Sequence, residues 1–365
     1  MKHVLHIIKN KQKLELRFAV LKLIREWFAR QGFTEVDAPQ IVSLPGQEPN
    51  IEPMKLAVHN EKGQSFTGYL HTSPEYAMKK MLAAGFDKIF YLGKCFRDRE
   101  SFGYNHNPEF TMLEWYRAKR DFRAIMDDTE SLCRFVANKV SRIKRKGLIN
   151  VENVKKLSGK WERVSMRELW KKFVGVELND FLTAKLLRKL CVQRGFKPAK
   201  SEDYEELFYR IFLNEVEPTL GVDRPIIVYN YPACMASLSS LCKKDKRYAE
   251  RFEVYFAGSE LANAFTELTH ADEQLARLTS ERIVRRKRGM LVYDVDREFI
   301  EALRFGFPQS ACLRGTLRQG AAGIALGVDR LIMSILGCKN IDDVIVFPMS
   351  KLWNNEEIKG VKEIC

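Results

Sequence analysis

Two arginines lie in settings that suit a phosphate-binding site. Arg97 lies in the segment Phe96-Arg-Asp-Arg-Glu100, and Arg330 ends the segment Ala325-Leu-Gly-Val-Asp-Arg330. A guanidinium group presents planar, paired donors to phosphate oxygens and keeps its charge at physiological pH. Two such groups on either side of a phosphate would neutralise the charge that develops at phosphorus. Either arginine taken alone is more simply explained as a surface charge.

Carboxylates gather in the same segments, and they suit either a metal ion or an ammonium group. Their oxygens are hard ligands of the kind that Mg²⁺ prefers when it carries phosphates. Each glutamate taken singly is best explained as a solvent-exposed side chain. Together with the arginine pair and Asn107, the glutamates indicate a site. They are Glu75, Glu100, Glu109, Glu114, Glu253, Glu260 and Glu267.

Several familiar kinds of site are excluded. The chain has neither a G-x-G-x-x-G nor a G-x-x-x-x-G-K-[ST] loop, so a Rossmann or P-loop nucleotide site has no support. Its eight cysteines form no C-x-x-C pair and only six histidines are present, which argues against a zinc site. We expect buried free thiols in a reducing cytosol. Cys95, next but one to Arg97, is expected to be a buried strand residue and not a nucleophile.

The elements that must position these residues begin with a helix and a hairpin. Thr72-Ser-Pro-Glu75 has the composition of a helix start, and Gly85 follows the last turn of that helix. Residues 88–96 and 109–117 are predicted strands, and the polar loop between them favours an antiparallel hairpin. Strand periodicity places Phe110, Met112, Glu114 and Tyr116 on one face and Thr111, Leu113 and Trp115 on the other.

The remaining pattern alternates helices with strands. A helix is predicted over 14–31 and a short strand over 33–39, followed later by helices over 121–140, 204–215 and 269–289. Strands are predicted over 224–231 and 250–256, and residues 258–267 are expected to line a site. A glycine-containing loop over 315–323 precedes residues 324–336, which begin as a strand and continue as a helix.

Charge suggests a polyanionic partner without choosing one. The 365 residues include 61 Lys and Arg against 47 Asp and Glu, a net charge of +14. Such a field attracts nucleic acid, ATP, an acidic protein or an anionic membrane. Residues 139–172 carry +9 of this charge, and we expect them to form an exposed insertion, either a solvated basic face or a docking surface. No apolar run is long enough to cross a membrane, and residues 1–10 do not resemble a secretory signal.

Five motifs in order resemble the catalytic domain of class II lysyl-tRNA synthetases. The most specific is His106-Asn-Pro-Glu-Phe-Thr-Met-Leu-Glu-Trp-Tyr116, whereas the two arginine motifs are common to all class II synthetases. The chain is most similar to the stand-alone relatives of these enzymes, the elongation factor P–(R)-β-lysine ligases. The resemblance runs from about Leu14 to Phe347. The other four motifs are Thr72–Glu75, Phe96–Arg97, Glu260–Asn263 and Ala325–Arg330.

The resemblance implies an α+β fold in which helices flank an antiparallel sheet. Residues 1–365 would form a single catalytic domain with a basic insertion at about 139–172 and no anticodon-binding domain. The helix over 14–31 and the strand ending at Pro39 would form a homodimer interface. The protein would be cytoplasmic and would not associate with membranes.

The resemblance also assigns roles to the candidate site residues. Arg97 and Arg330 would be the catalytic pair that grips the ATP phosphates, and Phe110 would stack on adenine. Mg²⁺ would be held by Glu253 and Glu260. The rest of the nucleotide site would be Glu100, Asn107, Glu260, Leu261 and Gly327. The amino-acid pocket would be lined by Ser73, Pro74, Glu75, Glu114, Tyr116, Asn263, Phe265, Glu267 and Ala325.

The implied reaction has two steps: ATP activates (R)-β-lysine or lysine as an adenylate, and the acyl group passes to a lysine side chain of elongation factor P. Such an enzyme works by alignment and charge neutralisation, without a covalent protein nucleophile. Glu267 is expected to bind the distal ammonium group, helped by Glu75 and Glu114. Ala325 stands where lysyl-tRNA synthetases tend to carry glycine, and its methyl group favours the displaced amino group of β-lysine.

Two other functions stay open. The chain is expected to lack room for an anticodon-binding barrel, because 13 residues precede Leu14 and 18 follow Phe347. A tRNA acceptor is therefore not expected, but a truncated lysyl-tRNA synthetase remains an alternative. A non-catalytic, synthetase-like RNA-binding protein is the other alternative. The motif position after Arg97 is also open, since Arg99 stands where a glutamate often follows and Glu100 is the candidate replacement.

Overall fold

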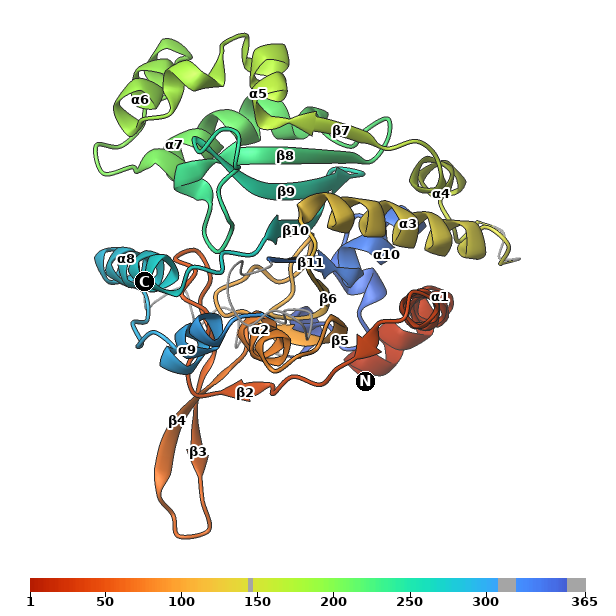
Figure 1. Cartoon of the computed structure of the whole chain (residues 1–365). Helices are drawn as coiled ribbons and strands as arrows, with labels where there is room; N and C mark the ends of the chain where they lie inside the picture. Colours follow the sequence, from red (N-terminus) through yellow and green to blue (C-terminus); the bar gives the residue numbers. More distant parts are fainter. Residues whose placement is uncertain (144–146, 308–319, 353–365) are drawn as a thin grey trace.

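The chain is built around an eight-stranded sheet. The computed structural model describes residues 1–143, 147–307 and 320–352. The strand order is β1-β5-β6-β11-β10-β9-β8-β7, antiparallel through the centre and parallel only in the end pairs β1–β5 and β7–β8 (Figure 1). The expected α+β fold with a largely antiparallel sheet is confirmed. The strands are β1 (Thr34–Glu35), β5 (Lys88–Phe96), β6 (Glu109–Ala118), β7 (Glu162–Ser165), β8 (Ile226–Pro232), β9 (Tyr248–Phe256), β10 (Ser259–Thr266) and β11 (Ala321–Gly327).

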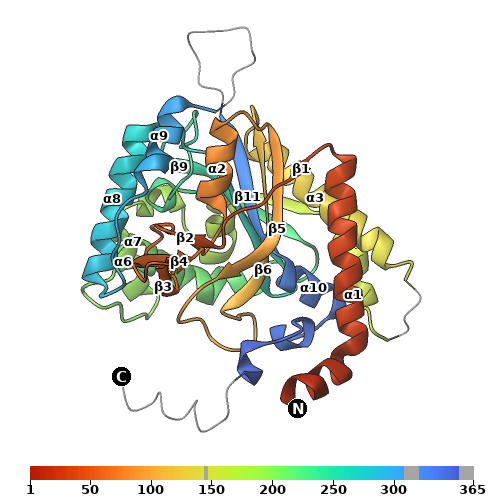
Figure 2. The same ribbon diagram turned by 90° about the horizontal axis from the view of Figure 1, so that it is seen from below.

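Helices cover both faces of this sheet. One side carries α1 (Lys2–Arg30), α3 (Phe122–Val140) and α10 (Val328–Leu336), and the other carries α2 (Glu75–Ala83), α8 (Ala271–Lys287) and α9 (Arg297–Phe305) (Figure 2). The two faces of β6 separate the two cores as its alternation predicts. Leu113 and Trp115 pack with the first group, while Met112 and Tyr116 pack with the second.

The β5–β6 hairpin is present as predicted. Its register pairs Lys88 with Arg117 and Phe96 with Glu109. The hairpin loop then turns back, since the Arg97 backbone N–H donates to the Pro108 carbonyl at 2.9 Å. The two strand ends therefore carry the arginine motif and the start of the longest motif to the same edge of the sheet.

The expectation of an exposed segment over 139–172 is wrong for its apolar residues. The segment contributes α4 (Val151–Ser158), the edge strand β7 and α5 (Met166–Leu169), followed by a π-helical turn over Trp170–Val174. Val154, Leu157 and Trp161 pack into the core beside α3. Most of the sparse apolar positions of this segment are buried, although Val151 is 76% exposed, and its charges cover the outside.

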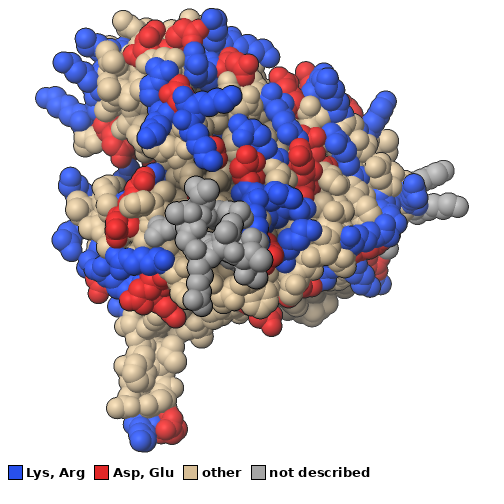
Figure 3. Space-filling model, in the orientation of Figure 1, with Lys and Arg blue, Asp and Glu red and all other residues tan. Residues whose placement is uncertain are grey.

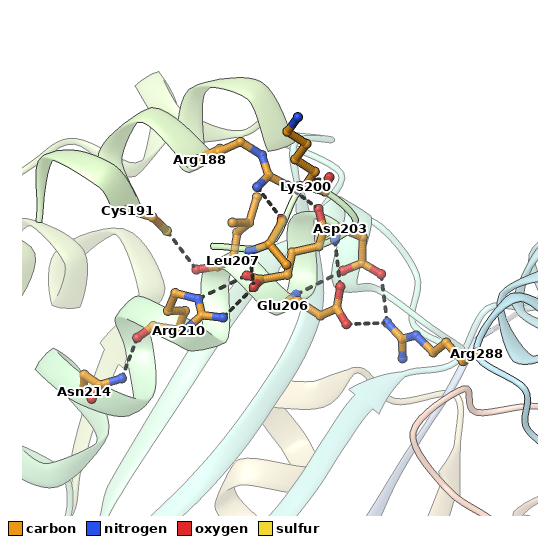
Figure 4. Close-up of polar contacts among 11 residues, drawn as sticks. Arg188, Cys191, Lys200, Asp203, Glu206, Leu207, Arg210, Asn214 and Arg288 are labelled. Atoms are coloured by element: carbon orange, nitrogen blue, oxygen red, sulfur yellow. Dashed lines mark hydrogen bonds and ion pairs between the residues drawn. The ribbon is translucent and has the colours of Figure 1, made fainter. Parts of the chain in front are cut away.

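A second apolar core lies above β8. It is formed by α5, α6 (Ala184–Gln193), α7 (Tyr204–Ile211) and the π-helical turn Phe212–Val216, with Trp170 against Phe208. Figure 4 shows how the connection between α6 and α7 is fixed: Arg188 donates to the carbonyls of Ala199 and Glu202 at 2.6 and 2.7 Å. The helix predicted over 204–215 is α-helical only as far as Ile211 and continues as the π-helical turn.

Two further features were not predicted from the sequence. Strands β2 (Ile41–Val42), β3 (Lys55–His59) and β4 (Ser65–Leu70) form a separate sheet whose hairpin projects from the body (Figure 1). Helix α1 begins at Lys2, well before the predicted start at Leu14. The apolar periodicity missed this first part because two residues that it buries, His6 and Asn10, are polar. The short 3₁₀ turns are Leu178–Phe181, Glu217–Thr219, Ala233–Met235, Ile341–Val344 and Met349–Lys351.

The cysteines, the loop over 315–323 and the absence of a long apolar run were also predicted from the sequence. The six cysteines in the described part of the chain are free thiols. Three of them are buried as expected, Cys242 and Cys338 are half-buried, and Cys234 is exposed. Most of the predicted loop over 315–323 lies outside the described residues. No helix of the described ranges is long and apolar enough to span a bilayer.

Candidate active site

A cavity of about 780 Å³ brings the predicted site residues together. Residues of β6, β9, β10 and β11 line it from the sheet, and residues of α7 and α8 close it from the side. Every predicted site residue lines this cavity except three. Glu109, at the start of β6, pairs with Lys94 at 3.0 Å outside the cavity. Pro74 stands at the N-cap of α2, and Glu267 lies buried directly behind the wall.

Two arginines mark one end of the cavity. Arg330 lies in the first turn of α10, directly after β11, and donates to the carbonyls of Glu260 at 2.9 Å and Asn105 at 3.3 Å. Arg97 extends from the end of β5, and its guanidinium carbon lies 5.0 Å from the centre of the Phe110 ring. Neither guanidinium has a carboxylate partner among the described residues. Both are therefore available to an anion that enters the cavity.

The loop after Arg97 places the two candidates for the open motif position differently. Glu100 lines the cavity, whereas Arg99 is exposed and adopts a φ of +58°. Glu100 accepts a 2.8 Å bond from His106 Nδ1, and this bond lowers the pKa of the carboxyl group. Asn107 holds the loop itself: its amide donates to the Glu109 carbonyl at 2.6 Å and accepts from the Met349 N–H at 3.0 Å.

The two glutamates predicted to hold Mg²⁺ differ in their surroundings. Glu253 on β9 accepts bonds from Arg251 and Tyr231, both at 2.6 Å, and from the Tyr255 hydroxyl. Burial and the charge of Glu253 raise the pKa of Glu260, on β10, to about 7. Among the described residues the Glu260 carboxylate has no hydrogen-bond partner, and they contain no cluster of three or more metal-ligating side chains. Glu260 thus fits a cation directly, while a metal ion at Glu253 would compete with three donors.

The other end of the cavity is acidic. Ser73 donates to Glu114 at 2.6 Å, and the Tyr116 hydroxyl donates to the other oxygen of Glu114 at 3.2 Å. Glu114 is only 1% exposed, and burial together with the neighbouring charge of Glu75 raises its pKa to about 8. Two hydroxyl donors therefore do not compensate this carboxylate, and a cation at the same place would.

The sequence reasoning missed one residue of this end, Lys79. Its ammonium group pairs with Glu75 at 2.5 Å and with Glu267, and its side chain is 1% exposed. The Phe265 and Phe299 rings lie 5.2 and 5.7 Å from the ammonium nitrogen. Burial outweighs this pairing for Glu267, whose pKa is raised to about 8. The available signal was spacing, because Lys79 follows Glu75 by four residues in a predicted helix.

Strand register sets the floor of this acidic end. Asn263 on β10, Ala325 on β11 and Glu114 on β6 are direct neighbours across the sheet. Two residues along the same strand pair, Gly323 of β11 faces Tyr116 of β6, and a Cβ at Gly323 would lie 2.2 Å from the Tyr116 ring. Glycine at 323 makes room for Tyr116, and the Ala325 methyl group faces the cavity between the polar side chains.

A third wall was also missed, because it comes from segments far apart in the sequence. Glu48, Glu205 and Glu281 line the cavity beside α7 and α8, and burial with the charges of the other two raises the pKa of Glu281 to about 8. Arg288 holds this wall together. It donates to Asn50 at 2.5 Å and to Asp203 at 2.9 Å, the latter contact visible in Figure 4.

Comparison with known proteins gives a consistent assignment. The family model described as tRNA synthetases class II (D, K and N) matches residues 4–351. An elongation factor P–(R)-β-lysine ligase of Yersinia enterocolitica is 36% identical over 338 residues, which are 92% of this chain and 94% of that protein. Proteins of the same name from Yersinia pestis and Yersinia pseudotuberculosis match to the same extent. The cavity, its arginine pair and these similarities agree, and the chain belongs to the class II tRNA synthetase family of the D, K and N type.

Proposed function

We propose that the protein is an ATP-dependent, AMP-forming ligase that activates (R)-β-lysine or lysine and transfers it to a lysine side chain of elongation factor P. The observation that carries this proposal is the layout of one cavity. A pair of arginines stands at one end. Glu75 and Glu114 line the other end, and behind its wall Lys79 pairs with Glu75 and Glu267. A diamino acid would fit this layout. Its carboxylate would point toward the arginines and the phosphates, and its two ammonium groups would lie at the acidic end.

The charge balance of the acidic end favours a diamino acid. Glu75, Glu114 and Glu267 contribute three negative charges and Lys79 one positive charge, which leaves room for two ammonium groups. Burial raises the pKa values of both Glu114 and Glu267, and the charge of Glu75 raises them further. A substrate with one ammonium group would leave a buried carboxylate unpaired, which is costly.

The first step is the attack of the substrate carboxylate on the α-phosphorus of ATP. A carboxylate oxygen forms a bond to phosphorus, the bond to the leaving oxygen breaks, and pyrophosphate departs. Arg97 and Arg330 would bind phosphate oxygens and neutralise charge as it develops. Phe110 would pack on the adenine ring. Bound Mg²⁺ would supply further neutralisation of the phosphates, with Glu260 as its direct ligand and Glu253 beside it.

The second step transfers the acyl group to an amine. The acceptor nitrogen attacks the acyl carbon of the mixed anhydride, AMP leaves, and the nitrogen loses a proton as an amide forms. None of these bonds involves an atom of the protein, and Cys95 is fully buried with a pKa well above its usual value. The enzyme therefore acts by alignment and by electrostatic stabilisation.

The proposal that elongation factor P is the acceptor rests on the similarity to proteins named elongation factor P–(R)-β-lysine ligase. Lys and Arg side chains spread over the upper part of the face in Figure 3, and such a surface attracts an acidic protein or RNA. The alternative of a tRNA-charging enzyme shares the first step and differs only in the acceptor. A non-catalytic RNA-binding protein would not need the arginines and carboxylates to share one enclosed cavity.

We also propose a homodimer that forms through α1, and a cytoplasmic location. Val4, Ile8 and Phe18 are 51%, 67% and 48% exposed. By helical spacing they lie within one face of α1. An apolar helix face open to water is a candidate contact for a second copy. Six free thiols among the described residues fit a reducing compartment.

Pyrophosphate exchange tests the proposed activation step without an acceptor. The enzyme is incubated with ATP, labelled pyrophosphate and one amino acid at a time: (R)-β-lysine, lysine or norleucine. We expect exchange with the two diamino acids and none with norleucine, which lacks the distal amine. Ala325→Gly should shift the preference toward lysine by about 10- to 200-fold, the value of a pocket methyl group. Absence of exchange with all three would favour the non-catalytic alternative.

A further inference from the structure

We propose that Lys79 is a positioning residue that fixes Glu75 and Glu267 and sets the net charge of the amino-acid pocket, so that the pocket selects a substrate with two ammonium groups. This inference rests on the proposed function, because it assigns a specificity role within the same site. It is carried by the contacts of Lys79 and by its place behind the cavity wall.

The geometry makes Lys79 a bridge between two carboxylates. Its ammonium group binds Glu75 Oε1 at 2.5 Å and Glu267 Oε2, so one oxygen of each carboxylate is occupied. Glu267 Oε1 is buried and has no hydrogen-bond partner among the described residues. It lies beside the backbone of Gly323, where a Cβ would approach it to 2.9 Å. The bridge thus holds Glu267 with its second oxygen unpaired next to the pocket.

Lys79 is well suited to hold this position. It comes from the rigid helix α2, its side chain is 1% exposed, and the Phe265 and Phe299 rings lie near its ammonium group. Lys79 does not line the cavity, whereas Glu75 does. Glu267 lies behind the same wall, with one oxygen beside the Gly323 backbone that lines the cavity. Lys79 therefore acts on the substrate through the two glutamates and not by contact.

The charged and titratable groups nearest this bridge are Glu75 from α2, Glu114 and Tyr116 from β6, and Glu267 after β10. On the outer side of Glu75, the charges of Glu48 and of Glu281 on α8 also act on this carboxylate. With Lys79 present, the three carboxylates match a diamino acid. Without it, three carboxylates would face two ammonium groups, and one carboxylate would remain unpaired in a buried site. Such a group takes up a proton instead.

The test replaces Lys79 with methionine, whose unbranched side chain is one heavy atom shorter and carries no charge. In pyrophosphate exchange, Lys79→Met should raise the KM for lysine or (R)-β-lysine at least tenfold and leave the KM for ATP within about twofold. The acidic limb of kcat/KM for the diamino acid should move to higher pH, because loss of the cation raises the pKa of Glu267 further. Lys80→Met is the control: Lys80 lies on the same helix but pairs with Asp296 and Glu298.

A double variant keeps the proposal testable if Lys79→Met is too unstable to assay. Lys79→Met/Glu267→Gln removes one charge of each sign and restores the original balance. Its thermal unfolding temperature should lie above that of Lys79→Met. An unchanged KM and acidic limb in Lys79→Met, or a double variant no more stable than the single one, would overturn the inference. If the wild-type enzyme exchanges with no diamino acid, the proposed function fails instead.

Discussion

At the scale of single residues, Arg330 shows why position decides the role of an arginine. The pentapeptide Leu-Gly-Val-Asp-Arg occurs twice, at 220–224 and 326–330. Arg224 is exposed in a turn before β8, whereas Arg330 follows β11 directly and reaches into the cavity. The same five residues thus produce a surface charge in one place and a phosphate-binding candidate in the other.

This pair of sites provides a matched mutation test. Arg330→Ala should lower pyrophosphate exchange by about 10²- to 10³-fold, as expected for the loss of one group that stabilises a developing charge. The thermal unfolding temperature should change little, because Arg330 is only half-buried and makes two hydrogen bonds to carbonyls. Arg224→Ala should leave both measurements unchanged. Full exchange activity in Arg330→Ala would show that the site is wrongly assigned.

Glu114 gives a prediction about pH. Its pKa is raised to about 8 in the folded, ligand-free protein, from a usual value near 4.5, so the folded state holds a proton that the unfolded state has lost between these values. The contribution of Glu114 to stability is therefore full below about pH 4.5 and is lost as the pH rises toward 8. Glu114→Gln should flatten this decline, as measured by urea unfolding between pH 5 and pH 8.

Binding of the substrate should depend on the same group with the opposite trend. An ammonium group pairs with ionised Glu114, so the affinity of the wild-type enzyme for lysine should rise as the pH increases toward 8. Calorimetric titration of the ligand-free enzyme measures this trend. An affinity that is constant between pH 6 and pH 8 would contradict the placement of Glu114 in the amino-acid pocket.

At the scale of elements, α1 links the proposed ATP site to the proposed dimer face. On its buried side, Arg17 donates to Thr111 at 2.6 Å and to the Val344 carbonyl at 3.1 Å, and it pairs with Asp329. Asp329 also accepts the Thr111 N–H at 2.7 Å and directly precedes Arg330. The same helix leaves Ile8 and Phe18 exposed on its other side.

Charge placed on the exposed face of α1 tests the dimer. Ile8→Glu and Phe18→Glu should each weaken self-association about tenfold or more, because an unpaired polar group in an apolar contact costs about 1–3 kcal/mol. Sedimentation equilibrium measures the dissociation constant. Ile283→Glu, at another exposed apolar residue, should have no effect. A wild-type protein that remains monomeric at high concentration would refute the proposed dimer.

How far the sequence predicted these elements depended on their periodicity. The faces of β6 followed from its alternation, and the cavity side of that strand was predicted with Phe110, Glu114 and Tyr116. Lys79 escaped because a lysine in an amphipathic helix is normally assigned to the solvent side. Glu48, Glu205 and Glu281 escaped because only tertiary packing brings a loop, α7 and α8 together. The β3–β4 hairpin escaped because its strands are mostly exposed and lack a buried face.

At the scale of the whole molecule, the basic surface should act on association and not on chemistry. Lys155, Lys160 and Lys172 are exposed on the 139–172 segment. The described residues provide no carboxylate partner for any of these three lysines. Their charge can therefore act on a partner at a distance of about 10 Å or less at moderate salt.

Reversal of these charges tests that role. Lys155→Glu/Lys160→Glu/Lys172→Glu should slow modification of elongation factor P about three- to tenfold at low salt and flatten its salt dependence. Pyrophosphate exchange should be unchanged. Lys9→Glu/Lys55→Glu/Lys62→Glu is the control with the same change in net charge, on α1 and the projecting hairpin. Equal slowing by both triple variants would show that net charge matters and that the segment has no special role.

The identity of the acceptor is the central claim, and one measurement tests it most directly. The enzyme is incubated with ATP, labelled (R)-β-lysine and either elongation factor P or tRNA, and the acid-stable label on each acceptor is counted. Label should accumulate on elongation factor P as an amide that survives mild alkali, and none should appear on tRNA. Label on tRNA, lost in mild alkali as an ester would be, with none on the protein, would contradict the account.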